Sequence, residues 1–256
     1  MLKKVKQYRF LFEELVKRDF KKKYKRTTLG ILWSMISPLL QLLVMNWVFL
    51  GFFGRSMPHF TIYLFSGNLV FSFFSEATNN GMEALASNAS IFSKINVPKY
   101  MFLLSKNVSS VINFLLTLVI YFIFVASDGL PFTPKFFLLI YPIICLVIFN
   151  IGVGLILSAL HVFFKDISYL YNIFTLLLMY LSAIFYNIAN YSPSSQRLFH
   201  LNPVYNYILY FRTIVIDGAI PGMWTHVLCV GFAMGALLIG AAMYYKYNFK
   251  FVFYLD

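Results

Sequence analysis

The side chains able to act as acids or bases are few and far apart in this chain. Between the first long apolar run and the C-terminal tail there are five acids, at Glu76, Glu83, Asp128, Asp166 and Asp217. Glu76 falls within an apolar run, and an acid at membrane depth is a candidate for a proton relay or a membrane transferase. The other interpretation is that Glu76 marks the interfacial end of a helix. The wide spacing of the acids does not indicate one shared site.

Metal-binding and nucleotide-binding patterns are not found in the sequence. No H-E-x-x-H motif occurs, so no metal site is expected. The two cysteines, Cys145 and Cys229, both lie in apolar runs and are interpreted as free buried thiols. No Gly-Lys pair occurs, so there is no G-x-x-x-x-G-K-[ST] phosphate loop with which the chain would bind ATP. The four histidines are His59, His161, His200 and His226.

Aromatic side chains make up 20% of the chain and are the remaining candidates for ligand contact. Apolar sugar faces pack on aromatic rings, and Tyr hydroxyls meet sugar hydroxyls at the ring edge. The alternative is an ordinary aromatic belt at the membrane interface. The candidates for lining a passage are Trp33, Trp47, Tyr180, Phe185, Tyr186, Tyr191, Tyr205, Tyr207 and Tyr210.

The composition places these residues in a membrane. The chain of 256 residues is 60% hydrophobic and only 12% charged, which excludes a soluble globule with a polar surface. The net charge of +12 is concentrated beside apolar runs, where lipid headgroups are the natural neighbours, so nucleic-acid binding is not expected. The first apolar run is longer than a signal-peptide core and no A-x-A-like site closes it, so we expect it to be retained.

The apolar runs predict an all-α membrane protein with about six transmembrane helices. Residues 81–100 are predicted to form a short helix outside the hydrocarbon, and 187–222 short re-entrant helices on the outer side. Pro38 is expected to kink the first span, and Gly152, Gly154 and Ser158 to permit close helix approach. Lys165 and Asp166 form a tight cytoplasmic turn between the fourth and fifth spans. The predicted spans are about 29–53, 60–79, 102–126, 136–164, 167–186 and 224–245.

Residues 1–28 form a unit of their own, an amphipathic helix on the cytoplasmic membrane interface, ahead of a transmembrane domain over 29–256. One face is apolar and the other basic; a topology signal without further role is the alternative interpretation. With six spans both termini lie on one side, and most of the 21 Lys and Arg fall on that side, which is therefore cytoplasmic. The basic residues on the outer side of the membrane would be Arg55, Lys135, Arg197 and Arg212. The apolar stripe contains Tyr8, Leu11, Phe12, Leu15, Val16, Phe20 and Tyr24.

Four segments carry a specific resemblance. Residues 24–33 read Y-K-R-T-T-L-G-I-L-W with Pro38 behind, and residues 88–99 read N-A-S-I-F-S-K-I-N-V-P-K. Residues 162–167 read V-F-F-K-D-I, and residues 201–203 read L-N-P, followed by Arg212 and Gly218. In this order they resemble motifs of the membrane (permease) subunits of polysaccharide-exporting ABC transporters, which export O-antigen, capsule or teichoic acid. The resemblance extends over nearly the whole chain.

The resemblance implies a half-transporter. Two copies of the chain would surround one path, and a separate ATPase, also in two copies, would bind ATP and Mg. The substrate would be a lipid-linked glycan, whose anchor phosphates Lys22, Lys25 and Arg26 would meet at headgroup depth. The resemblance further implies that 81–99 contacts the ATPase. The coupling residues would be Glu83, Ile91, Phe92, Lys94, Val97, Pro98 and Lys99.

Two positions depart from the family pattern. Lys165 replaces the usual Arg and so lacks the planar guanidinium that can pair in a bidentate way. Ala183 occupies the position of the proline in the family motif S-P-I-x-Y. Without that proline a straighter outer end of the fifth span is expected. The residues are also compatible with two other functions. One is a permease that exports a drug or lipid. The other is an integral-membrane glycosyltransferase or acyltransferase built on Glu76, Asp166 or Asp217.

Overall fold

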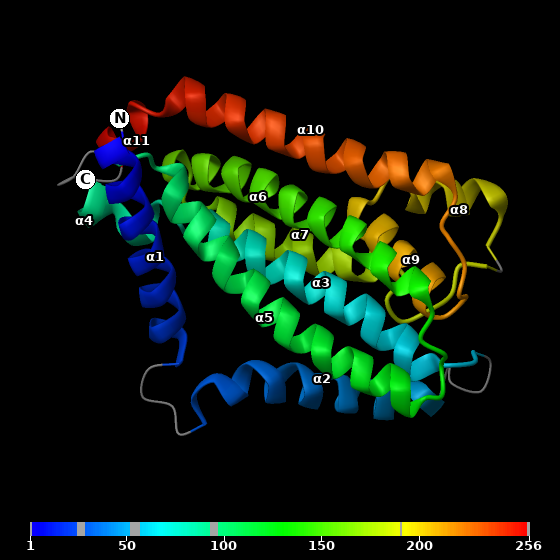
Figure 1. Cartoon of the computed structure of the whole chain (residues 1–256). Helices are drawn as coiled ribbons and strands as arrows, with labels where there is room; N and C mark the ends of the chain where they lie inside the picture. The colour runs from blue at the N-terminus through cyan, green and yellow to red at the C-terminus, as the bar shows by residue number, and fades with distance from the viewer. Residues whose placement is uncertain (1, 25–28, 52–56, 93–96, 190, 255–256) are drawn as a thin grey trace.

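The computed structural model describes residues 2–24, 29–51, 57–92, 97–189 and 191–254. Six long helices run along the length of the molecule, and each corresponds to one predicted span (Figure 1). They are α2 (Trp33–Phe49), α3 (Phe60–Met82), α5 (Tyr100–Ser127), α6 (Ile140–Phe163), α7 (Ile167–Leu181) and α10 (Met223–Tyr247).

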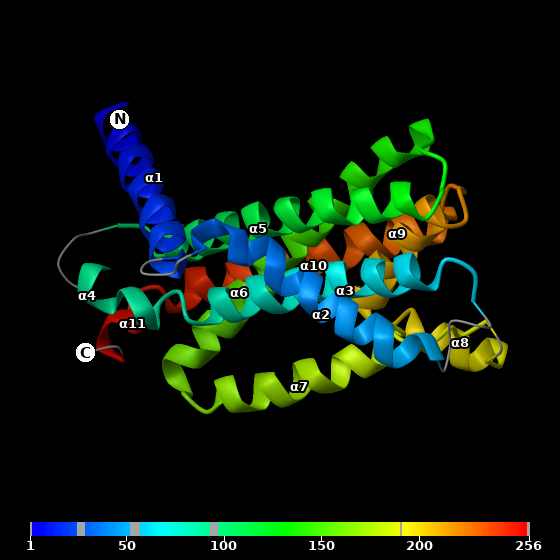
Figure 2. The same ribbon diagram turned by 90° about the horizontal axis from the view of Figure 1, so that it is seen from below.

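The remaining helices lie at the two ends of this bundle (Figures 1 and 2). Near both termini are α1 (Leu2–Tyr24), α4 (Ala89–Phe92) and α11 (Lys250–Phe253), while α8 (Pro193–Phe199) and α9 (Pro203–Val215) lie at the opposite end. The described residues also contain the 3₁₀ segments η1 (Gly30–Leu32), η3 (Ala86–Asn88) and η4 (Pro134–Leu139). Short helices are therefore present in both 81–100 and 187–222, at opposite ends.

Three stretches of the described residues are long and apolar enough to cross a bilayer. They are Tyr100–Ser127, Pro134–Phe163 and Met223–Tyr247, with mean hydropathies of 2.4, 2.7 and 2.1. The helices α2 and α7 are apolar but span only 17 and 15 residues. The chain is thus an all-α membrane protein, and the count of six crossings stays a prediction.

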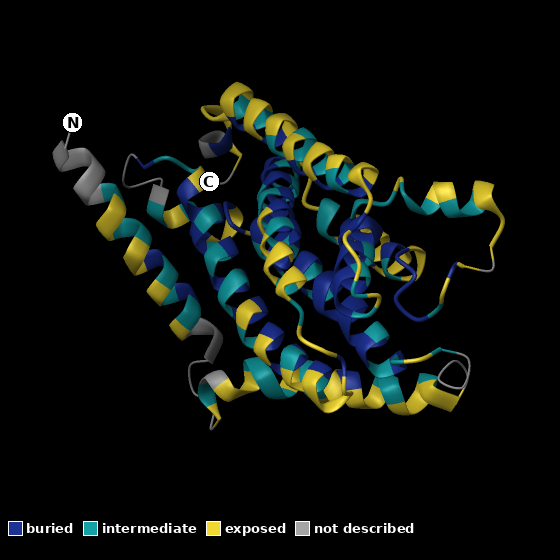
Figure 3. Ribbon diagram, turned by 45° about the vertical axis from the view of Figure 1, so that its right-hand side comes forward, coloured by how far each residue is buried: buried dark blue, intermediate teal, exposed yellow. Residues whose placement is uncertain are grey.

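Aromatic packing places α3 at the centre of the bundle. The rings of Phe73 and Phe114 stack with centroids 4.5 Å apart, which joins α3 to α5. The rings of Phe74 and Phe149 lie 5.8 Å apart and join α3 to α6. Figure 3 shows buried residues in the middle of the bundle and exposed residues along its outer helices. Every residue of α3 is buried or half-buried.

Glycines bring α6 and α10 into close contact. A Cβ placed on Gly152 would lie 2.4 Å from the backbone N of Leu237, and one placed on Gly240 would lie 2.7 Å from the carbonyl O of Gly152. Gly154 also lies close to α3, because a Cβ placed on Gly81 would be 3.0 Å from the Gly154 Cα. The predicted close approach at Gly152 and Gly154 is confirmed.

The predicted outer end of the fifth span is wrong. The helix α7 ends at Leu181 and not at Tyr186, because Ala183 adopts a left-handed conformation with φ of 50°. The carbonyl oxygens of Ala183 and Ile184 then accept hydrogen bonds from Arg212, at 2.9 and 3.1 Å. The guanidinium of Arg212 on α9 thus holds the chain where it turns away from the end of α7.

Candidate functional site

A polar groove lies between α2, α3 and α5. The cavity has a volume of about 810 Å³, within the range of small-molecule binding sites. We call it the polar groove; only Met179 is contributed by α7. Its polar lining consists of Ser34, Ser37, Gln41, Asn68, Ser72, Ser75, Glu76, Asn79, Asn80, Asn113 and Thr117.

Helical spacing explains why these polar side chains share one space. On α3 the polar positions 68, 72, 75 and 79 follow one another at intervals of four, three and four residues, which places them on one face. On α2, positions 34, 37 and 41 follow the same rule, as do 113 and 117 on α5. The apolar faces of the same helices pack on the core or face outward. This spacing was the signal in the sequence that would have revealed the groove.

Hydrogen bonds orient the side chains of the polar groove. The Asn113 amide on α5 donates to Glu76 Oε1 on α3 at 2.7 Å, a short distance typical of a bond to a carboxylate. The Asn79 amide donates to the carbonyl O of Ser75 at 2.8 Å. Half-buried Glu76 is therefore held by a neighbouring helix.

The polar groove combines hydrogen-bond acceptors, hydrogen-bond donors and the aromatic side chains of Trp33, Phe71, Phe73 and Phe114. Glu76 and the amides accept hydrogen bonds, the serine hydroxyls both donate and accept, and Trp33 presents an indole that is 43% exposed. A solute with many hydroxyls and apolar ring faces matches this set. Several of these polar groups also bond to one another, as Asn113 does to Glu76 and Ser72 to Asn68.

The other predicted path residues divide into two groups. Trp47 and Tyr180 are exposed, at 83% and 55%, on α2 and α7. Phe185, Tyr205 and Tyr207 are packed inside the chain; the Tyr207 hydroxyl, for example, donates to the Cys229 carbonyl O at 2.8 Å. Of the remaining candidates, Tyr186 is half-buried and its hydroxyl donates to Tyr180 O at 2.7 Å, Tyr191 is exposed and Tyr210 is buried. Of all these aromatics, Trp33 alone is among the residues that line the polar groove.

The predicted coupling residues lie at the end of the molecule that holds the termini. Glu83 is exposed at the C-cap of α3, and Ile91 packs half-buried from α4. Val97 is buried and Pro98 half-buried. The side chain of Phe92, which closes α4, and the whole of Lys94 lie outside the described part of the chain.

Lys99 has partners within the chain. Its ammonium donates to the carbonyl O of Asn248 and lies 5.7 Å from the ring centroid of Phe251. Partial burial lowers the pKa of Lys99 below its ordinary value. The C-terminal segment thus contacts the predicted coupling segment, a contact that the sequence did not indicate.

The remaining predicted positions are placed as follows. Lys165 and Asp166 are exposed in the short turn between α6 and α7, where the Ser168 hydroxyl donates to Lys165 O at 3.0 Å. Lys22 belongs to α1, but its side chain is not described, and Lys25 and Arg26 lie outside the described residues.

The acids do not converge on one site. Glu76 lines the polar groove, Asp166 lies in the α6–α7 turn, and Asp217 follows α9. The helix α9 and the α6–α7 turn lie at opposite ends of the molecule (Figure 2). Asp217 borders a second cavity, of about 220 Å³, which Arg212 and Tyr63 also line. Partial burial raises the pKa of the Asp217 carboxyl. This separation gives no support to a transferase built on these three acids.

A family model described as "ABC-2 type transporter" matches residues 11–216, which is most of the chain. An O-antigen export system permease protein of Klebsiella pneumoniae is 26% identical over 248 residues, covering 94% of this chain and 95% of its own length. A capsule polysaccharide export inner-membrane protein of Neisseria meningitidis is 23% identical and covers 91% of this chain and 89% of its own length. A polysialic acid transport protein of Escherichia coli is 24% identical, with 91% of each chain covered.

Proposed function

This chain belongs to the ABC-2 type transporter family, and from that membership we propose that it is the membrane subunit of an ATP-driven exporter of a lipid-linked polysaccharide. The polymer would be of the O-antigen, capsule or teichoic acid kind, carried across the bacterial cytoplasmic membrane. The similar proteins are named for export of O-antigen, capsule polysaccharide and polysialic acid.

The observation that carries the proposal is the polar groove. In an apolar membrane protein, polar side chains on three adjacent helices are costly unless other polar groups of the protein, water or a polar solute bond to them. Hydroxyls, amides, one carboxylate and the Trp33 indole together suit a sugar. The same lining disfavours a permease for small lipophiles, which would have no use for these groups.

The partners follow from the family. A separate ATPase subunit would bind ATP and Mg, and two copies of the chain and two of the ATPase would form the transporter. The ATPase would dock at the end that carries α4 and both termini, so that 81–100 is the coupling segment. This end would face the cytoplasm, in agreement with the concentration of Lys and Arg in the first 26 residues.

The proposal also assigns a role to three basic residues at the depth of the lipid headgroups. Lys22, Lys25 and Arg26 would receive the phosphates of the lipid anchor. Neutralising all three is expected to lower export while the complex with the ATPase still forms. Unchanged export in that triple variant would contradict this role.

The central test is to make the polar groove apolar. Ser72→Leu places a branched alkyl group on the groove face of α3 and is expected to abolish export of surface polysaccharide in a bacterium that depends on this chain. Val119→Leu, at a position of α5 that is 54% exposed, is the matched control and should leave export unchanged. Both variants should be present in the membrane at the wild-type level. Normal export by Ser72→Leu at wild-type abundance would contradict the proposal.

A further inference from the structure

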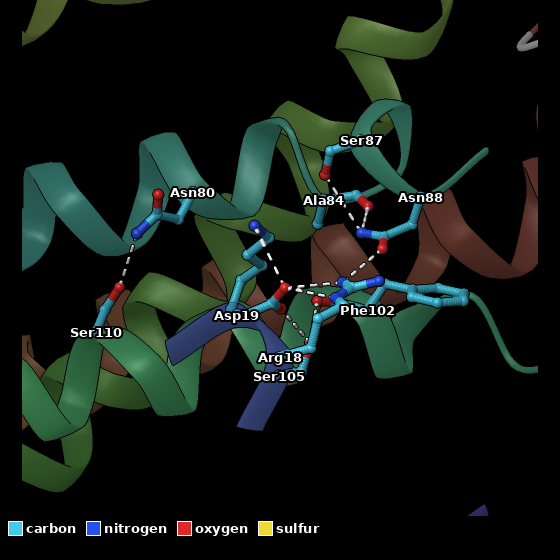
Figure 4. Close-up of polar contacts among 10 residues, drawn as sticks. Arg18, Asp19, Asn80, Ala84, Ser87, Asn88, Phe102, Ser105 and Ser110 are labelled. Atoms are coloured by element: carbon cyan, nitrogen blue, oxygen red, sulfur yellow. Dashed lines mark hydrogen bonds and ion pairs between the residues drawn. The ribbon is translucent and has the colours of Figure 1, made fainter. Parts of the chain in front are cut away.

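A buried carboxylate joins two helices at the end of the molecule that holds both termini. Asp19 lies on α1, and its side chain is 3% exposed. Its Oδ1 accepts a hydrogen bond from Arg18 Nη2 at 2.7 Å, and its Oδ2 accepts one from the Ser105 hydroxyl at 3.2 Å (Figure 4). The Lys106 ammonium lies 3.8 Å from Oδ1. Asp19 therefore fastens α1 to the first turns of α5.

Arg18 extends this contact to a third segment. The same Nη2 atom that binds Asp19 donates to Asn88 Oδ1 at 2.7 Å. Asn88, on η3, is 1% exposed, and its amide donates to the carbonyl O of Ala84 at 2.8 Å, which fixes the orientation of its side chain. The set formed by Arg18, Asp19, Asn88, Ser105 and Lys106 is called the Asp19 clasp below.

The composition of the buried face of α1 shows that the clasp is not the simplest way to attach this helix. Leu11, Leu15 and Asp19 follow one another at intervals of four residues, and Leu15 and Asp19 are both buried. An apolar residue at position 19 would bury more apolar area than Asp19 does and would desolvate no charge. Buried ion pairs add little net stability over apolar packing. Charge-assisted hydrogen bonds, in contrast, fix distance and direction. The clasp therefore controls geometry.

We propose that Asp19 is a positioning residue that, together with Arg18, ties η3 to α1 and to α5, so that these three elements move as one unit. This rests on the proposed function, in which an ATPase displaces the part of the coupling segment that contains η3. The helix α5 also carries Asn113 and Thr117 of the polar groove. A movement of η3 that the clasp passes to the start of α5 would therefore move these groove residues as well. Loss of the clasp would separate ATP hydrolysis from export.

The functional test compares two acids of the same helix. Asp19→Asn keeps the shape of the side chain and removes its charge; Glu14→Gln makes the same change at an exposed acid that pairs with Lys17 at 2.9 Å. In vesicles containing the chain and its ATPase, Asp19→Asn is expected to lower export per ATP hydrolysed about tenfold, a common size for coupling between sites. Glu14→Gln should leave this ratio unchanged. An unchanged ratio in Asp19→Asn would overturn the proposal, and so would a parallel loss of export and hydrolysis.

A second measurement does not depend on the transported substrate. Spin labels at Glu14→Cys and Ala86→Cys, both exposed positions, report the distance between α1 and η3 in the assembled complex. The buried Cys145 and Cys229 would first be replaced by alanine. The distance distribution should be narrow in the parent and broad with Asp19→Asn. If the parent complex exports no polysaccharide, the proposed function is wrong. The distance measurement would still show whether the clasp holds α1 and η3 together.

A second variant covers the case in which Asp19→Asn does not fold. Arg18→Lys keeps the positive charge but removes the planar fork with which Arg18 contacts Asp19 and Asn88. The same broadening of the α1–η3 distance is expected. A distribution as narrow as that of the parent would overturn the proposal.

Discussion

The guanidinium of Arg212 lies over the ring of Tyr63, with its Cζ atom 3.4 Å from the ring centroid. The same group donates to the carbonyl oxygens of Tyr63, Ala183 and Ile184, so a residue of α9 holds the start of α3 and the chain beyond α7. Arg212 is 6% exposed, and the structure thus stabilises a buried cation with carbonyl groups and an aromatic face. This contact organises the end of the bundle that contains α8 and α9.

Arg212→Lys is expected to destabilise the chain, because an ammonium cannot reach the same carbonyl oxygens as a planar fork. The loss should be about 3 kcal/mol, the scale for disrupting a buried charge and its partners. Thermal unfolding of the purified chain in detergent measures it as a lowered Tm. Arg197→Lys is the control, because Arg197 is exposed on α8. Equal Tm values for the two variants would contradict a structural role of Arg212.

Gly152→Ala should severely weaken the contact between α6 and α10. The added Cβ would lie 2.4 Å from the Leu237 backbone N, and backbone cannot move aside as a flexible side chain does. The control is Gly235→Ala on α10, since a Cβ there would have no atom within 4 Å. That change is expected to raise stability by up to about 1 kcal/mol through helix propensity. The prediction fails if thermal unfolding ranks the two variants in the opposite order.

Tyr244→Phe removes one buried hydrogen bond. The Tyr244 hydroxyl lies 2.7 Å from Ser158 Oγ between α10 and α6, and its loss should cost about 1 kcal/mol. Tyr245→Phe changes the next residue, which is 91% exposed, and should have no measurable effect. Comparing the two Tm values separates the hydrogen bond from the general effect of removing a tyrosine hydroxyl on α10.

The contact between Glu76 and Asn113 should be measurable as a coupling. Asn113 Nδ2 lies 2.7 Å from Glu76 Oε1, so Glu76→Gln and Asn113→Ala are expected to be non-additive by about 1 kcal/mol in a double-mutant cycle on stability. Additive effects would show that the two side chains do not support each other. If Glu76 also binds sugar hydroxyls, Glu76→Gln should reduce export more than it lowers Tm.

Much of the helical layout was predicted from local composition. The span predicted at 224–245 is α10, Met223–Tyr247, and the span predicted at 60–79 begins with α3 at Phe60. The end of α7 was predicted wrongly because the apolar run continues past Leu181, while the helix is ended by a left-handed Ala183 whose carbonyl binds Arg212. Because Arg212 is far from α7 in the sequence, the local hydropathy around α7 does not indicate this contact.

The candidate site was only partly accessible from the sequence. Glu76 and Trp33 were singled out, yet the polar groove was missed because its lining comes from three helices and becomes visible only as a shared face. Asp19 received no role, since its partners Ser105 and Asn88 lie far along the chain.

By itself, the sequence determined that the chain is a helical membrane protein, where its long helices lie, and which family pattern it follows. These properties depend on runs of neighbouring residues, whose transfer from water to lipid is nearly independent of the rest of the chain. Only the tertiary structure decided that Asn113 meets Glu76, that Arg212 ends α7, and that Asp19 joins α1 to α5. Such contacts depend on which helices are neighbours, because a hydrogen bond requires atoms within about 3 Å, whatever their separation in the sequence.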